Sequence, residues 1–155
     1  MSEVDGAARR QDASGKPVRL SALKGQWLLV GVRGANCRAA CQQRLLRVAQ
    51  FRETLGKDKD RVDLVWFVND NAAFADSAQG DARGTWMLRV APEVLHQWLG
   101  LPAGASSEDD LYVVDPLGHA MARFPAHFDS EGAKQMRRVW TRLLRASVAW
   151  DPPGR

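Results

Sequence analysis

The chain has 155 residues, of which 45% are hydrophobic and 26% are charged, and its formal net charge is +4. This length fits one domain and is too short for two cores of ordinary size, while the hydrophobic content and six Trp residues exclude an intrinsically disordered chain. The longest uncharged apolar run, near Trp27–Val32, is far shorter than the roughly 20 residues that cross a bilayer, and the polar N-terminus has no apolar signal-peptide core, so we expect neither a transmembrane helix nor a signal peptide.

The N-terminal half predicts two buried strands joined by a helix, after a short strand over Val18–Leu23. Trp27–Val32 is a continuous apolar run, which is typical of a strand covered on both faces, and Val62–Val68 (Val-Asp-Leu-Val-Trp-Phe-Val) is interpreted as a second buried strand. Between them Arg38–Leu55 has a helical pattern, and Gly56 is placed to end that helix. Two strands joined through a helix of this length should lie parallel.

The C-terminal half predicts a strand, a short helix, a hairpin and a long final helix. Residues 71–84 have no period and are interpreted as a loop or a weak helix. The other elements are a strand over Thr85–Val90, a helix from Pro92 to about Leu99, hairpin strands over Leu111–Asp115 and Ala120–Phe124, and a helix from Asp129 or Ser130 to about Val148.

The order of these elements predicts an α/β single domain with a central mixed β-sheet flanked by helices. The hairpin adds antiparallel strands to the parallel pair, and the final helix packs on one face. The expected organisation is a flexible leader over residues 1–16, one folded domain over residues 17–148 and a tail over residues 149–155.

The final predicted helix is amphipathic. Its basic residues fall within a narrow arc at 100° per residue, and they are Lys134, Arg137, Arg138, Arg142 and Arg145. Apolar residues such as Trp140 lie opposite, so the basic side should face water. We interpret it as a solvated face, with an acidic partner or an anionic membrane surface as the alternatives. No aromatic residues interleave the charges, and we therefore predict no nucleic-acid partner.

Both cysteines of the chain, Cys37 and Cys41, lie at the start of the first predicted helix, after a buried strand and a short loop. The unsatisfied N–H groups and the positive dipole end there favour a thiolate, and Arg33 and Arg38 act in the same direction. A spacing of four residues places both sulfurs on one side, where they can form a disulfide or offer two soft ligands to one metal ion. We expect Cys37 to be the more exposed and more acidic thiol.

A structural role is the alternative, because free cysteine is common in protein cores. Cys41 shares a helix face with Leu45 and Val48, which would suit a buried thiol. The C-x-x-x-C spacing disfavours a generic thioredoxin-type enzyme, and two thiols without a neighbouring histidine disfavour a tetrahedral structural zinc. The position of the pair favours a functional role for Cys37 and Cys41.

The chain resembles the Sco/SenC family in several passages. They are Leu23-Lys24-Gly25-Gln26-Trp27 with the following strand, Cys37 to Cys41, Arg61–Val68, and Leu111–Pro125 with its Tyr112-Val113-Val114-Asp115-Pro116-Leu117-Gly118. The resemblance spans about residues 17–148. It implies a thioredoxin-like single domain that assists copper insertion into cytochrome c oxidase.

Some positions depart from the family pattern. Gln42 stands where a proline commonly follows the second cysteine, and no proline directly precedes the Leu111 strand, where thioredoxin-type enzymes place a cis-proline. The family supplies a copper-binding histidine from the segment that is Ser106–Asp110 here, and this segment contains none. The histidines of the chain are expected in surface or packing roles, and they are His96, His119 and His127.

The missing histidine changes which oxidation state of copper we expect the site to bind. Copper(I) can be held by two thiolates alone, so Cu(I) is the expected metal at Cys37 and Cys41. Cu(II) also prefers nitrogen and oxygen donors, and its binding is expected to be weak. Asp110→His is the substitution expected to strengthen it.

The leading hypothesis is therefore a Sco-like accessory protein of cytochrome c oxidase biogenesis. Cys37 and Cys41 would cycle between dithiol and disulfide and handle Cu(I), and the partner would be a cytochrome oxidase subunit or another copper or thiol-redox protein. The family works at the periplasmic face of the inner membrane, where an N-terminal helix commonly holds it, and such a helix is not expected in this chain.

Two alternatives stay open. The first is an enzyme, a thiol–disulfide reductase or a peroxidase-like protein with Cys37 as the nucleophile and Cys41 as the resolving thiol. The second is a non-catalytic interaction protein in which the two cysteines form a structural disulfide and the basic final helix is the docking face.

Overall fold

The computed structural model describes residues 11–12, 23–72, 85–102 and 104–148. In these residues the centre of the molecule is a six-stranded sheet with the order β1-β4-β3-β2-β5-β6. Its strands are β1 (Gln11–Asp12), β2 (Trp27–Arg33), β3 (Val62–Val68), β4 (Thr85–Arg89), β5 (Asp110–Val114) and β6 (Ala120–Pro125). The helices are α2 (Ala39–Glu53), α3 (Pro92–Leu99) and α4 (Ser130–Ala146), with the 3-10 helices η2 (Gly56–Arg61) and η3 (Ser107–Asp109).

The central strands β2, β3 and β4 run parallel, and β5 and β6 extend the sheet in antiparallel fashion. β2 and β3 pair over their full length, from Trp27 opposite Val62 to Arg33 opposite Val68. Every residue of both strands is buried, as predicted, and this includes Asp63 of β3. Because β2 and β3 end at the same level, the loops that follow them meet at one edge of the sheet.

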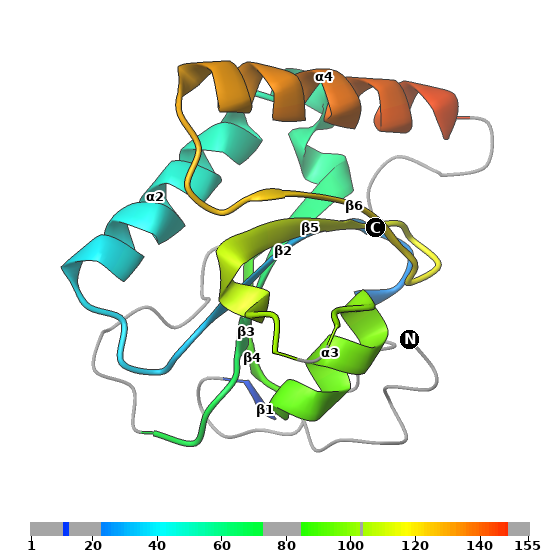
Figure 1. Ribbon diagram of the computed structural model, residues 1–155. Helices are drawn as coiled ribbons and strands as arrows, with labels where there is room; N and C mark the ends of the chain where they lie inside the picture. Colours follow the sequence, from blue (N-terminus) through cyan, green and yellow to red (C-terminus); the bar gives the residue numbers. More distant parts are fainter. Residues whose placement is uncertain (1–10, 13–22, 73–84, 103, 149–155) are drawn as a thin grey trace.

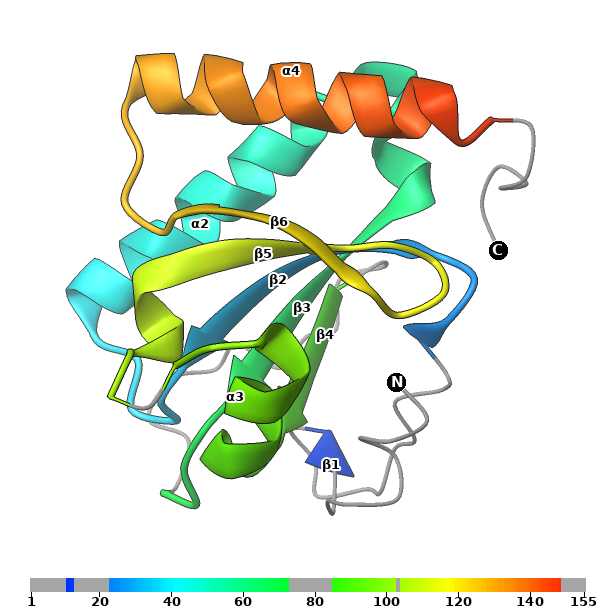
Figure 2. The same cartoon turned by 45° about the vertical axis from the view of Figure 1, so that its right-hand side comes forward.

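Helices cover both faces of the sheet (Figures 1 and 2). On one face α2 and α4 contribute Val48 and Trp140 to a core with β2, β3 and β5. Trp140 packs edge-on against Trp27, with ring centroids 5.7 Å apart. On the other face α3 packs through Leu95 and Leu99. The predicted mixed sheet flanked by helices is confirmed.

A few boundaries differ from the predictions. The helix α2 ends at Glu53, and Gly56, with a φ of 63°, begins η2 instead of ending α2 directly. Gln11–Asp12 lie in the expected leader but form β1, which pairs antiparallel with β4. A polar strand of this length has no periodic signal in the sequence. Residues 18–22 of the first expected strand, residues 73–84 and the expected tail, residues 149–155, lie outside the described residues.

Candidate functional site

Cys37 and Cys41 form a disulfide at the start of α2. The two sulfurs are 2.02 Å apart and the Cα atoms 5.2 Å apart. Cys37 ends the loop that follows β2, and Cys41 is the third residue of α2. Because β2 lies between β3 and β5, this disulfide sits where the parallel strands of the sheet end. The expectation that both sulfurs lie on one side of the helix start holds.

The order of exposure of the two cysteines is the reverse of the prediction. In the disulfide form Cys37 is 2% exposed, whereas Cys41 is half-buried. The physical reason is that α2 begins at Ala39, so that Cys37 belongs to the loop, where its N–H donates to the carbonyl of Ala35 at 3.2 Å. The prediction of Cys37 as the more exposed sulfur is therefore wrong for this state.

Gln42 stabilises the first turn of α2 next to the disulfide through two hydrogen bonds. Its side-chain amide donates to the carbonyl of Cys37 at 2.9 Å, and its backbone N–H donates to the carbonyl of Arg38 at 2.8 Å. Arg38 is the N-cap residue and offers no side-chain hydrogen bond to the helix. A proline at position 42 could make neither bond. With Gln42 in place of the family's proline, the first turn of α2 therefore gains two hydrogen bonds that proline could not make.

The loop between β2 and Cys37 is fastened from two sides. Arg33 is fully buried and donates to the carbonyls of Gly34 at 2.8 Å and Ala35 at 3.0 Å. From the end of β3, Asp70 Oδ1 accepts the N–H of Ala35 at 3.2 Å. A side chain at Gly34 would place its Cβ 3.0 Å from Asp70 Oδ2, so a larger residue there would have to displace the Asp70 carboxylate by a few tenths of an ångström. These contacts hold the loop that carries Cys37.

Arg44 links α2, the helix with the cysteines, to β2 and η3. Its Nη2 donates to the carbonyl of Val32 and its Nη1 to the carbonyl of Glu108, each at 3.0 Å. Its guanidinium lies 5.5 Å from the centroid of the Trp66 ring. Burial lowers the pKa of Arg44, Glu108 opposes that shift, and the charge of Arg33 adds to it. A positive charge is thereby held one helical turn from Cys41.

The segment in which the family carries a histidine lies against these same groups. Glu108 Oε2 accepts from Asn69 Nδ2 at 3.3 Å, so the Glu108 side chain reaches the end of β3. Tyr112 fastens the segment, because its hydroxyl donates to the carbonyl of Ser107 at 3.1 Å. Burial raises the pKa of Tyr112 to about 12, and the hydroxyl keeps its proton at all physiological pH values.

Arg33 was expected to act on the Cys37 thiolate, but four other polar residues near the start of α2 were not predicted as part of the site. They are Arg44, Asn69, Asp70 and Glu108. The available signal was the position of Asn69-Asp70 directly after a buried strand. Polar side chains at the carboxyl ends of parallel strands are commonly functional. The contribution of Glu108 had no local signal.

The three histidines are dispersed. His96 is on α3, which covers the sheet face opposite α2, and His119 Nδ1 lies 3.2 Å from Asp115 Oδ2 at the β5–β6 turn. His127 is exposed in the loop after β6. Among the described residues, no group of three or more His, Cys, Asp and Glu side chains is arranged to hold a metal ion. The reduced Cys37–Cys41 pair is the soft donor set that the site offers.

Comparison with protein families identifies one match. The model of the family described as "Transmembrane-like, thioredoxin-like, C-terminal domain" matches residues 27–147, which span β2 to the end of α4. A comparison with curated protein sequences finds no match.

Solved structures of Sco proteins have the same fold. Yeast Sco1 with copper bound has a TM-score of 0.64 at 15% identity, covering 91% of this chain and 92% of Sco1. Bradyrhizobium japonicum ScoI with copper bound has a TM-score of 0.54 at 17% identity, covering 84% and 96%. BsSco, described as a Sco-family cytochrome c oxidase assembly protein with a disulfide switch, has a TM-score of 0.58 at 16% identity, covering 86% and 89%. The predicted thioredoxin-like fold and its resemblance to Sco proteins are confirmed.

Proposed function

Because the chain belongs to the family of transmembrane-like, thioredoxin-like C-terminal domains, we propose that it is a Sco-like accessory protein of cytochrome c oxidase biogenesis. Cys37 and Cys41 cycle between a dithiol and a disulfide, and the dithiol binds Cu(I). The partner is a cytochrome oxidase subunit or another copper or thiol-redox protein at the periplasmic face of the inner membrane. The disulfide at the start of α2 is the observation that carries this proposal.

The position of the disulfide suits exchange better than structural reinforcement. Its cysteines are four residues apart, and closing so short a loop stabilises a fold by only about 2 kcal/mol in the chain-entropy description. Two apolar cores, one on each face of the sheet, already stabilise the domain. Cys41 is the more exposed of the two cysteines, and we expect an incoming thiolate to attack its sulfur. A disulfide of this kind persists in an oxidising compartment, which supports the periplasmic location.

We expect a partner protein to reduce this disulfide by thiol–disulfide exchange at the more exposed cysteine. A thiolate of the partner attacks Cys41 Sγ, the Cys37–Cys41 bond breaks, and Cys37 leaves as a thiolate. A second thiolate of the partner then attacks the partner sulfur of the mixed disulfide and releases Cys41. The partner's two thiols supply the two electrons and lose two protons, and Cys37 and Cys41 take up two protons. The partner is left with its own disulfide.

The reduced pair also fits Cu(I) as a cargo. Cu(I) accepts low coordination numbers and prefers thiolates, and the backbone already brings the two cysteines to a Cα separation of 5.2 Å. Arg44, held by the carbonyls of Val32 and Glu108, lies on the same helix and favours the negative charge of a bis-thiolate complex. In the disulfide form the sulfurs have no thiolate character, so binding and oxidation exclude each other.

A titration of both redox forms tests the proposal. We expect the anaerobic dithiol protein to remove about one equivalent of Cu(I) from a coloured bicinchoninate complex and the disulfide protein to remove none, because only thiolates bind Cu(I) tightly. Binding by the disulfide form would contradict it. Absence of binding by both forms, with thiol exchange intact, would favour the alternative of a thiol–disulfide reductase.

Glu108→His should create a Cu(II) site that the native chain lacks. The Glu108 side chain contacts Asn69, and its carbonyl contacts Arg44 on the helix of Cys41, so an imidazole at this position lies on the cysteine side of the sheet edge. We expect the reduced variant, mixed anaerobically with Cu(II), to show a thiolate-to-Cu(II) charge-transfer band that the native protein lacks. Adding one nitrogen donor to two thiolates provides what Cu(II) prefers.

Asp110→His, the substitution that the sequence suggested, is a matched control. Asp110 begins β5 and, by strand alternation, shares with Tyr112 the face that α3 covers, whereas α2 with Cys41 covers the other face. Both variants exchange one carboxylate for one imidazole, but we expect only Glu108→His to gain the band. A band in the native protein, or equal bands in both variants, would contradict this placement.

A further inference from the structure

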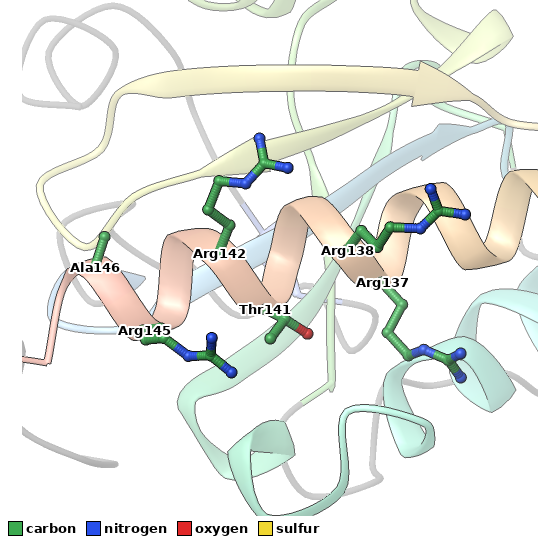
Figure 3. A pocket seen from close by; sticks show the side chains of 6 residues that line it. All are labelled: Arg137, Arg138, Thr141, Arg142, Arg145 and Ala146. Carbon is green, nitrogen blue, oxygen red and sulfur yellow. The ribbon is translucent and has the colours of Figure 1, made fainter.

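Four arginines form a basic hollow on the outward side of α4. The hollow has a volume of about 460 Å³ and is lined by Arg137, Arg138, Thr141, Arg142, Arg145 and Ala146. In Figure 3 the guanidinium groups extend from both flanks of the helix, with Arg138 and Arg142 on one flank and Arg137 and Arg145 on the other. All four arginines are exposed. We call these four side chains the α4 arginine face.

The charges of the α4 arginine face are not neutralised within the described part of the chain. None of the four arginines makes an ion pair or a side-chain hydrogen bond there, whereas Lys134 is paired with Glu131 at 3.4 Å. After Glu131 the helix contains no further Asp or Glu. Four like charges within three helical turns repel each other, so an anionic partner on this face relieves that repulsion and adds attraction.

The opposite side of α4 is already occupied by the protein core. Met136, Trp140 and Leu144 are each at most 1% exposed. The helix therefore has no apolar face left to insert between lipid chains, and no described helix is long and apolar enough to cross a membrane. Any contact made by the α4 arginine face is an electrostatic contact at its surface.

The α4 arginine face lies at the far end of the sheet from the disulfide. Arg61, which precedes β3, donates to the carbonyl of Leu144 at 3.0 Å and to Ser147 Oγ at 2.9 Å. The C-terminal end of α4 is thereby held at the amino end of β3. The disulfide follows the carboxyl end of the neighbouring β2, roughly 20 Å away along a strand of this length.

We propose that the α4 arginine face binds the phosphate groups of an anionic membrane surface and leaves the Cys37–Cys41 disulfide free for a partner. A protein partner is the weaker choice, because protein interfaces have an apolar centre and this face offers only Thr141 and Ala146 between its arginines. One guanidinium group can donate two parallel hydrogen bonds to the oxygens of a phosphate group. Each basic residue near an anionic lipid surface strengthens membrane binding about fivefold. Membrane binding by this face is independent of the proposed copper and redox function.

Vesicle flotation tests this proposal. We expect the protein to bind vesicles of equal parts phosphatidylglycerol and phosphatidylcholine, and not phosphatidylcholine alone, with binding lost at high salt because exposed charges are screened. R138Q/R142Q/R145Q should weaken binding about a hundredfold at low salt. The control K24Q/K57Q/R123Q also removes three exposed positive charges, none of them on α4, and should weaken binding only a few fold.

Three outcomes would overturn it. Equal losses in the two triple variants would mean that net charge alone attracts the protein, and equal binding to both vesicle types would exclude phosphate recognition by charge. Binding to poly-glutamate without binding to anionic vesicles would assign the face to an acidic protein. The variant C37S/C41S should float like the native chain, so failure here is separate from failure of the Cu(I) titration.

Discussion

Replacing either Cys37 or Cys41 with serine is expected to reduce tight Cu(I) binding by the reduced protein from about one equivalent to none. A serine hydroxyl is a hard and neutral donor, so each variant leaves a single thiolate, which cannot complete even the lowest common coordination of Cu(I). No described histidine or carboxylate joins the pair as a third donor, and nothing there compensates for the lost sulfur. Competition against a coloured Cu(I) chelator under anaerobic conditions measures the change.

Ala40→Ser is the matched control for the cysteine variants. Position 40 lies between the two cysteines, in the first turn of α2, and is exposed, so the substitution adds the same hydroxyl while both thiols remain. We expect this variant to retain about one equivalent of Cu(I). Tight stoichiometric binding by C37S/C41S would refute the assignment of Cys37 and Cys41 as the metal ligands, whatever the control does.

Gly31→Ala is expected to destabilise the domain by about 3 kcal/mol. Gly31 lies in β2 opposite Trp66 of β3, and a Cβ at position 31 would overlap the Trp66 ring. Trp66 is 3% exposed and packed between the sheet and α2, so the ring has no free space to enter. A cost of this size is a large share of the stability of an ordinary domain. Urea unfolding followed by circular dichroism measures it.

A double-mutant cycle identifies the cause of this loss. Trp66→Leu removes the ring that the new methyl group would contact, so Gly31→Ala should cost much less when it is introduced into Trp66→Leu. An equal cost in both backgrounds would mean that the glycine is needed for another reason. The contact also bears on the site, because the Trp66 ring supports the guanidinium of Arg44.

Much of the fold could be predicted because its signals are local. The helix over Pro92–Leu99 and the strand over Val62–Val68 agree with the prediction at both ends. In the helix, Pro92 and Gly100 mark the two ends, and in the strand, Arg61 and Asn69 flank a mostly apolar run. The N-cap of α4 is Asp129, whose side chain accepts the N–H of Gly132 at 2.8 Å, a bond that depends only on neighbouring residues.

The site could be predicted only in part. The Cys37–Cys41 pair is visible in the sequence because its members are one helical turn apart. The contact of Arg44 with Glu108 joins residues 64 positions apart, and that of Asn69 with Glu108 joins residues 39 positions apart. Such contacts depend on the order and register of the strands that carry them. For the same reason the sequence favours Asp110 as the position for a histidine, whereas in the folded sheet this residue lies on the α3 face.

The sequence by itself determined the α-helices and strands from β2 to α4, the parallel pairing of β2 with β3, and the two sulfurs at a helix start, since each follows from periodicity, chain length or spacing. Only the tertiary structure decided which of the two cysteines is the more exposed. The first residue of α2 is Ala39, so Cys37 stays in a loop held by Arg33 and Asp70, whereas Cys41 lies on the helix. Burial depends on what packs around a residue, and the packing partners of Cys37 come from strands that meet only in the folded sheet.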